Sequence, residues 1–151
     1  MKRFVLSLLL LASPLHAEPI WSTAQFLDSI RFVAHAGQRD TVYARAQTII
    51  DGLEYLGSHH LRVPDRPEAR SVFQALCASG IKLLLLQDQS PSLTEAKAMG
   101  RDCLDGVEGP NEINDNPNRH RFAGQIGLPA ILLHQRVLFD QAQAWLSLIH
   151  I

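Results

Sequence analysis

The sequence has only two cysteines, no long hydrophobic run and almost no net charge. Cys77 and Cys103 do not form the paired spacing of a metal-thiolate site, so no metal is expected there. The longest apolar run near the amino end, Phe4 to Ala12, is shorter than the ~20 residues that a membrane span needs. The formal net charge is −1 and the charges are interspersed. Neither nucleic acid nor a membrane is therefore an expected partner.

The first 17 residues have the layout of a secretory signal. Lys2 and Arg3 precede the apolar run, and the small residue Ala17 suits cleavage after it. We therefore expect a secreted or periplasmic protein. That compartment permits disulfides, but the sequence alone favours two partly buried thiols at Cys77 and Cys103 over a bridge.

The last six residues, Leu146 to Ile151, spell the translation of a transposon-derived sequencing adapter. We interpret residues 146–151 as an adapter-derived tail. The alternative is a genuine apolar helix end. Either interpretation leaves residues 18–145 as the part whose pattern predicts a fold.

A helix–glycine–strand unit recurs along residues 18–145. Alternating elements of this length indicate βαβ units and a parallel sheet. The punctuating glycines are Gly57, Gly80 and Gly106. The expected helices span 44–56, 67–79, 93–103 and 128–145, and the expected strands span 29–35, 58–63, 81–87 and 104–108.

Residue periodicity supports these elements. The apolar residues of the first expected helix recur three or four positions apart, which predicts one apolar stripe facing a sheet: Ala46, Ile49, Ile50, Leu53 and Leu56. Gly57 suits a left-handed helix cap. The segment from Ile81 to Leu86 is almost continuously apolar, as expected of a parallel strand covered on both faces.

Three segments carry a resemblance to a known family: Phe26 to Ile30, Tyr55 to Arg62, and above all Glu108 to Asn114. In this order they resemble cellulase-like bacterial secreted glycosidases of clan A of the glycoside hydrolases. The resemblance implies a (β/α)8 TIM barrel, here truncated to about its first four βα units, because a complete barrel takes ~250 residues. It also implies retention of configuration at a β-linked glycan, with no cofactor.

The resemblance implies a role for several residues. Glu112, just after the fourth strand, would be the general acid/base, and Asn111 would hydrogen-bond the sugar 2-hydroxyl. Arg62 would orient the nucleophile and lower its pKa, although a surface pair with Asp65 is the competing interpretation. The nucleophile itself belongs to a seventh strand, which this chain lacks.

Two further residues are candidate substrate contacts. His35, at the end of the first expected strand, is placed to line the mouth of the barrel, the alternative being a satisfied buried histidine. Gln87, at the end of the third expected strand, would hydrogen-bond sugar hydroxyls, and a simple turn is the alternative. His59 and His60 do not predict a metal site, since adjacent strand residues point to opposite faces.

No other glutamate is expected to replace the missing nucleophile. Glu54, Glu68 and Glu95 are expected on helices or loops away from the catalytic face, and Glu108 lies within the fourth strand. The chain alone is therefore expected to be inactive. A rival interpretation is a non-catalytic carbohydrate-binding or adhesion module on a barrel-like scaffold, since fold does not fix function. A metal-dependent hydrolase or phosphodiesterase would need His and Asp ligands that the strand ends lack.

Overall fold

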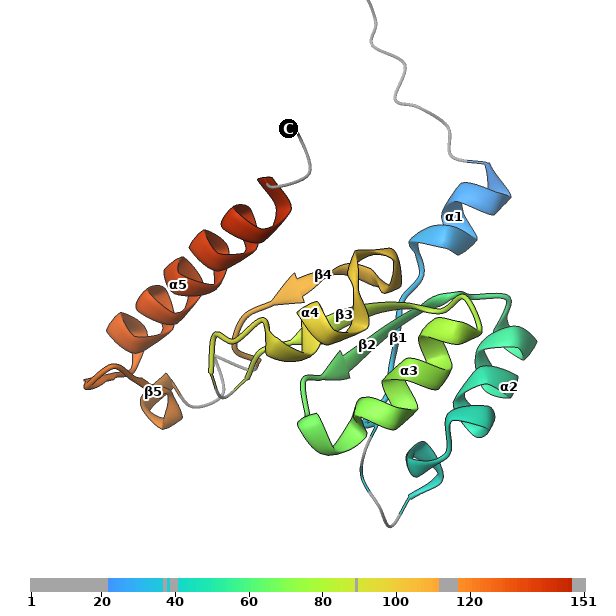
Figure 1. The fold of residues 1–151 in the computed structure, drawn as a ribbon, viewed down its shortest axis with the longest axis horizontal. Coiled ribbons are helices and arrows are strands. Elements are labelled where there is room, and N and C mark those ends of the chain that lie inside the picture. Colours follow the sequence, from blue (N-terminus) through green and yellow to red (C-terminus); the bar gives the residue numbers. More distant parts are fainter. Residues whose placement is uncertain (1–21, 37, 39–40, 89, 112–116, 148–151) are drawn as a thin grey trace, which may run out of the picture.

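The computed structural model describes residues 22–36, 38, 41–88, 90–111 and 117–147. These residues form an α/β fold around a four-stranded parallel sheet (Figure 1). The strands lie side by side in sequence order, which is β1-β2-β3-β4. Their bounds are Phe32–Val33, His60–Pro64, Lys82–Leu86 and Leu104–Glu108.

Within the described residues, five α-helices and a small hairpin accompany the sheet. The helices are α1 (Thr23–Ser29), α2 (Ala46–Leu56), α3 (Arg70–Ala78), α4 (Thr94–Met99) and α5 (Leu128–Ser147), with short 3-10 turns η1 (Val42–Ala44), η2 (Pro67–Ala69), η3 (Arg101–Cys103) and η4 (Pro117–Arg119). The hairpin pairs β5 (Arg121–Phe122) with β6 (Gln125–Ile126). None of the helices in the described part has the length and apolarity needed to cross a bilayer.

The local sequence accounts for where α2 forms and ends. Of its expected stripe, Ile49, Ile50 and Leu53 are buried and Ala46 is half-buried, whereas Leu56 at the end of the helix is exposed. Gly57 caps the helix at φ 68°, and its amide donates to the carbonyls of the last turn. Glycine adopts this left-handed conformation without the steric penalty that a Cβ brings. The predicted helix and its cap are confirmed.

The two faces of the sheet differ in character. Helices α2, α3 and α4 lie against one face (Figure 1), where Leu61, Val63, Leu83 and Leu85 are almost completely buried. The opposite face carries half-buried residues of β2 and β3, among them His60, Arg62, Lys82 and Leu84. The expectation that β3 is covered on both faces is confirmed only in part, because on this second face Leu86 is buried whereas Lys82 and Leu84 are half-buried. The apolar run of β3 thus reflects one helix-covered face and two apolar residues, Leu84 and Leu86, on the other.

The sequence predicted β4 with its correct bounds, whereas the amino end differs. Ser29 was expected to open a strand, but it closes α1, and β1 is only two residues long. The reason is a capping box: the Ser22 hydroxyl accepts from the Gln25 amide, and the Gln25 side chain accepts from the Ser22 amide. These reciprocal bonds stabilise a helix start.

Cys77 and Cys103 form a disulfide, so the preference for free thiols was wrong. Cys77 lies in the last turn of α3 and Cys103 in η3, just before β4. Packing of these two segments brings the Cα atoms to 5.3 Å, which is within the usual range for a bridge. Sequence spacing does not encode this proximity.

Candidate functional site

Asn111 lies just past the carboxyl end of β4 and is held from two neighbouring strands. Its side-chain oxygen accepts a hydrogen bond from Arg62 Nη2 at 2.9 Å. Its backbone amide donates to Asp88 Oδ1 at 3.0 Å, and Asp88 follows β3. Contacts from β2 and from the segment after β3 thus fix the residue that precedes Glu112. Glu112 itself lies outside the described residues.

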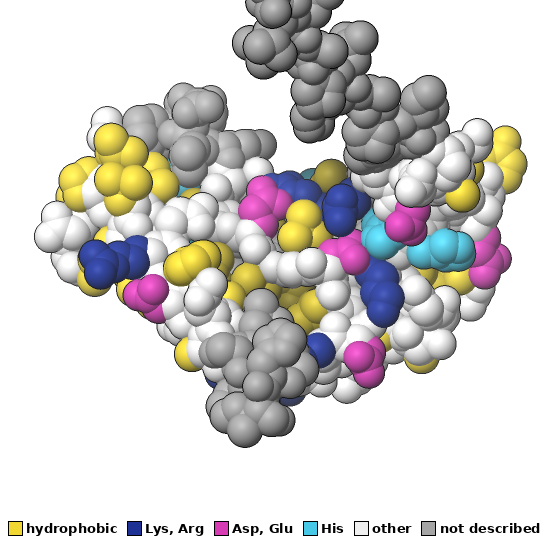
Figure 2. Space-filling model, turned by 90° about the horizontal axis from the view of Figure 1, so that it is seen from above, with side chains coloured by type: hydrophobic (Ala, Val, Ile, Leu, Met, Phe, Trp, Pro, Cys, Tyr) yellow, Lys and Arg dark blue, Asp and Glu magenta, His cyan; other side chains and the backbone are white. Residues whose placement is uncertain are grey.

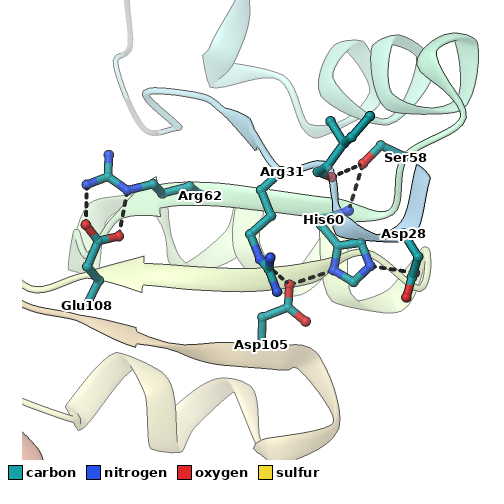
Figure 3. A network of polar contacts seen from close by, with 8 residues as sticks. Asp28, Arg31, Ser58, His60, Arg62, Asp105 and Glu108 are labelled. Atoms are coloured by element: carbon teal, nitrogen blue, oxygen red, sulfur yellow. Dashed lines mark hydrogen bonds and ion pairs between the residues drawn. The ribbon is translucent and has the colours of Figure 1, made fainter. Parts of the chain in front are cut away.

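Arg62 also makes a two-pronged ion pair with Glu108 (Figure 3). Its Nε donates to Oε2 at 2.7 Å and its Nη2 to Oε1 at 2.8 Å. The predicted alternative pairing of Arg62 with Asp65 does not occur. The hydrogen bonds from Arg62 lower the pKa of Glu108 below its usual value, which outweighs the opposite effect of burial. Glu108 is therefore ionised at neutral pH and holds the guanidinium beside Asn111.

The Gln87 side chain is buried within the protein. Its side-chain amide donates to Asp65, and its backbone amide donates to the Glu108 carbonyl at 2.7 Å. Contact with a sugar through this side chain stays a prediction. His35 lies two residues after β1 and is exposed, so it is not the buried histidine of the alternative interpretation, and its contact with substrate also stays a prediction.

A cavity of about 310 Å³ lies at the carboxyl edge of the sheet. Its lining includes two carboxylates that the sequence did not predict to lie there. It is lined by Asp65 and Glu95, together with Gln87 and Asp88. Burial raises the pKa of Asp65, and its Oδ1 has no hydrogen-bond partner. Glu95 is on a helix as predicted, but it does not lie away from this edge. Arg70 holds it there through two hydrogen bonds, which lower its pKa.

A second polar cluster occupies the amino end of the sheet. His60 Nδ1 lies 2.6 Å from Asp105 Oδ2, and His60 Nε2 lies 2.8 Å from Asp28 Oδ1 (Figure 3). Arg31 contacts Asp105 at 3.4 Å. The imidazole thus joins α1 to β4 through two carboxylates. In the space-filling view of Figure 2, acidic, basic and histidine side chains extend along the middle of the molecule. No group suited to holding a metal ion occurs among the residues that the structure describes.

We expect the His60 bridge to make stability fall as the pH rises above neutrality. Burial lowers the pKa of His60, but the hydrogen bonds and charges of Asp28 and Asp105 raise it more, to above its ordinary 6.5. A raised folded-state pKa contributes stability that is complete below the unfolded value and is lost as the pH passes the folded value. The hydrogen bond from His60 also lowers the pKa of Asp28, whose contribution is lost in acid. The free energy of unfolding should therefore be highest between the pKa of Asp28 and the pKa of His60 in the folded protein.

Urea unfolding at about pH 6 and about pH 9 checks this expectation, with a loss of about 1 kcal/mol at the higher pH. His60→Gln should remove most of that difference. The matched control is His35→Gln, an exposed histidine outside the cluster, which should leave the difference intact. If the free energy of unfolding changed equally between the two pH values in the wild type and in His60→Gln, a stabilising role of the His60 bridge would be contradicted.

Sequence reasoning missed three residues that line the cavities of the carboxyl edge: Asp65, Glu95 and His134. Asp65 carried one available signal, its position directly after the β2 strand, where the carboxyl ends of parallel strands meet. His134 lies in the second turn of α5 and carried none, because nothing in a helical repeat of residues shows which histidine will face a cavity.

Comparisons with protein-family models, with curated proteins and with solved structures yield no match.

Proposed function

We propose that the chain is the amino-terminal half of a secreted, retaining TIM-barrel glycoside hydrolase that cleaves a β-linked glycan. Glu112 is its general acid/base, and residues 1–17 direct its export. The nucleophile is a second carboxylate at the end of a seventh strand, outside this chain. The proposal rests on the resemblance carried by residues 108–114 and on the site that surrounds Asn111.

The single observation that carries the proposal is the fixation of Asn111. Arg62 from β2 and Asp88 after β3 both hydrogen-bond to it. An asparagine that must meet a sugar hydroxyl needs a fixed amide, because a misplacement of about 1 Å is enough to lose much of the rate. Glu112 is the next residue in the sequence, and the carboxyl edge at which Asn111 lies is the catalytic face in barrels of this class.

The arrangement of the sheet supports a barrel. Parallel strands in sequence order with right-handed crossovers place all connecting helices on one face, and α2, α3 and α4 lie on one face here (Figure 1). A sheet wound in this single direction can curl into a closed barrel when further strands are added. In the described part, β1 and β4 are the two edges with which such strands would pair. The half-buried face that carries Arg62 and Leu84 would then point into the barrel.

The proposed residues divide the reaction between them. Protonated Glu112 gives its proton to the glycosidic oxygen as the bond to the anomeric carbon breaks, and the carboxylate later takes a proton from the attacking water. The Asn111 side-chain amide bonds the 2-hydroxyl, and this bond strengthens as the ring acquires oxocarbenium character. Arg62 and Asp88 contribute by positioning Asn111. Arg62 also brings a positive charge that would favour the ionised nucleophile.

The test is to sequence the source DNA across codon 145 and to express both the present chain and the extended product. We expect the frame to continue through about four more βα units with a glutamate ending the seventh strand. The extended protein should hydrolyse β-linked chromogenic glycosides with retained configuration, observed by NMR of the first-formed sugar. The present chain should show no turnover.

Two results would count against the proposal. Robust hydrolysis by the present chain would show that a second barrel carboxylate is not needed. An extended product that binds glycans without hydrolysing them, and that lacks a glutamate at the seventh strand, would favour the carbohydrate-binding alternative.

A further inference from the structure

A second cavity shares Asp88 with the carboxylate-lined one, and basic residues contribute much of its lining. It has a volume of about 230 Å³ and lies between Asp88, the η4–β5 segment and the first turns of α5. Arg119, His120 and Arg121 line it as a basic wall from the η4–β5 segment, and His134 lines it from α5. Among the described residues that line it, Asp88 is the only carboxylate, and one of its oxygens already accepts from the Asn111 amide.

Arg119 and Arg121 have no ion-pair partner in the described part of the chain. None of the carboxylates that the structure describes lies within ion-pair distance of either guanidinium group. Arg62 and Arg70, by contrast, are each paired with a glutamate. A cavity with two such guanidinium groups presents several N–H donors in a fork that matches a carboxylate or a phosphate.

His134 supplies a second and independent feature. Its side chain is almost completely buried, with 3% of the residue exposed, and its Nε2 has no hydrogen-bond partner. Burial lowers the pKa of His134 more than its bond with the Gln87 backbone raises it. The ring is therefore neutral, and with one nitrogen bonded to that backbone, Nε2 is left as a free acceptor. A buried polar atom without a partner is destabilising unless a ligand supplies one.

The hairpin is built to hold this wall in place. Ala123 at φ 48° and Gly124 at φ 78° form the two-residue turn between β5 and β6, the conformation that matches the twist of hairpin strands. Phe122 then packs on the His134 ring at a centroid distance of 5.4 Å. The backbone of His120 accepts from Gly127 at 3.0 Å, just before α5. Basic wall and histidine are thus joined into one unit.

We infer that this cavity binds an acidic sugar unit of the glycan, with the ring carboxylate on Arg119 and Arg121 and a ring hydroxyl donating to His134 Nε2. A uronic acid offers both groups on one ring, whereas a neutral hexose offers only the hydroxyl and an inorganic anion only the charge. The inference rests on the proposed function, since it names the substrate class of that same site. It places the acidic unit next to Asn111, and so beside the bond to be cleaved.

Calorimetric titration of the full chain with methyl β-D-glucuronide and with methyl β-D-glucoside tests the inference. The glucuronide is expected to bind at least about tenfold tighter, and its affinity should fall with added salt. Arg119→Gln and Arg121→Gln should each remove most of that preference while leaving the weak glucoside binding unchanged. His134→Gln should weaken both ligands. The matched control is Arg136→Gln, an exposed arginine of α5 whose partner is Asp140, which should leave both affinities unchanged.

Three results would overturn the inference. They are equal affinity for the two glycosides, glucuronide binding that is insensitive to Arg119→Gln and Arg121→Gln, and inorganic phosphate binding as tightly as the glucuronide with the same sensitivity. The last result would identify a general anion site. None of these measurements depends on turnover, so failure here leaves the hydrolase proposal standing. Loss of hydrolysis in the extended protein with glucuronide binding retained would reject the hydrolase proposal alone.

Discussion

Glu112→Gln in the extended protein is expected to reduce hydrolysis of an unactivated β-linked glycan by about 10²–10⁴-fold. The amide keeps the size and polarity of the side chain but can neither give a proton to the leaving oxygen nor take one from water. The measurement is kcat/KM on a natural oligosaccharide, compared between variant and wild type. Glu54→Gln, which alters an exposed glutamate on α2, provides the control and should leave the rate unchanged.

Substrates with different leaving groups distinguish an acid/base role of Glu112 from a structural role. An aryl glycoside with a strongly acidic phenol needs little proton donation, so formation of the glycosyl-enzyme should be much less impaired by Glu112→Gln. Added azide should then restore turnover, because it attacks the intermediate without help from a base. A variant whose losses are equal on activated and unactivated substrates would show that Glu112 acts in folding or binding instead.

Removal of the disulfide is expected to lower the free energy of unfolding by about 3 kcal/mol, since the bridge closes a loop of ordinary length in the unfolded chain. Cys77 and Cys103 are 26 residues apart and join α3 to the start of β4. For a chain of this size, that loss corresponds to a decrease in Tm of about 10 °C. Thermal melts of the wild type and of the double variant Cys77→Ala/Cys103→Ala measure it.

Reductant provides the internal control for this prediction. Dithiothreitol should bring the wild type down to the Tm of the double variant and leave the variant unchanged. Equal melting temperatures for oxidised wild type and double variant would contradict a stabilising bridge. Because β4 leads to Asn111, the double variant of the extended protein should also lose activity at temperatures where the wild type is still folded.

The sequence predicted the sheet better than the site. The apolar stripe of α2, the cap at Gly57 and the bounds of β4 follow from periodicity and from glycine conformation, which are local properties. The position of Asn111 at the carboxyl edge followed from those elements. By contrast, η4 and the β5–β6 hairpin were not among the expected elements, because Ala123-Gly124 is a weak turn signal beside the usual Asn-Gly.

The sequence by itself determined the order of strands and helices and the edge at which Asn111 and Arg62 meet. The tertiary structure alone decided which side chains are partners: Arg62 with Glu108 instead of Asp65, Glu95 with Arg70, and Cys77 with Cys103. It also decided that His134 faces a basic cavity. The physical reason is the separation along the sequence of the residues that interact. Helix and strand periods depend on neighbours a few residues apart, whereas these contacts join residues about 25 or more apart, and only packing brings them within hydrogen-bonding or bonding distance.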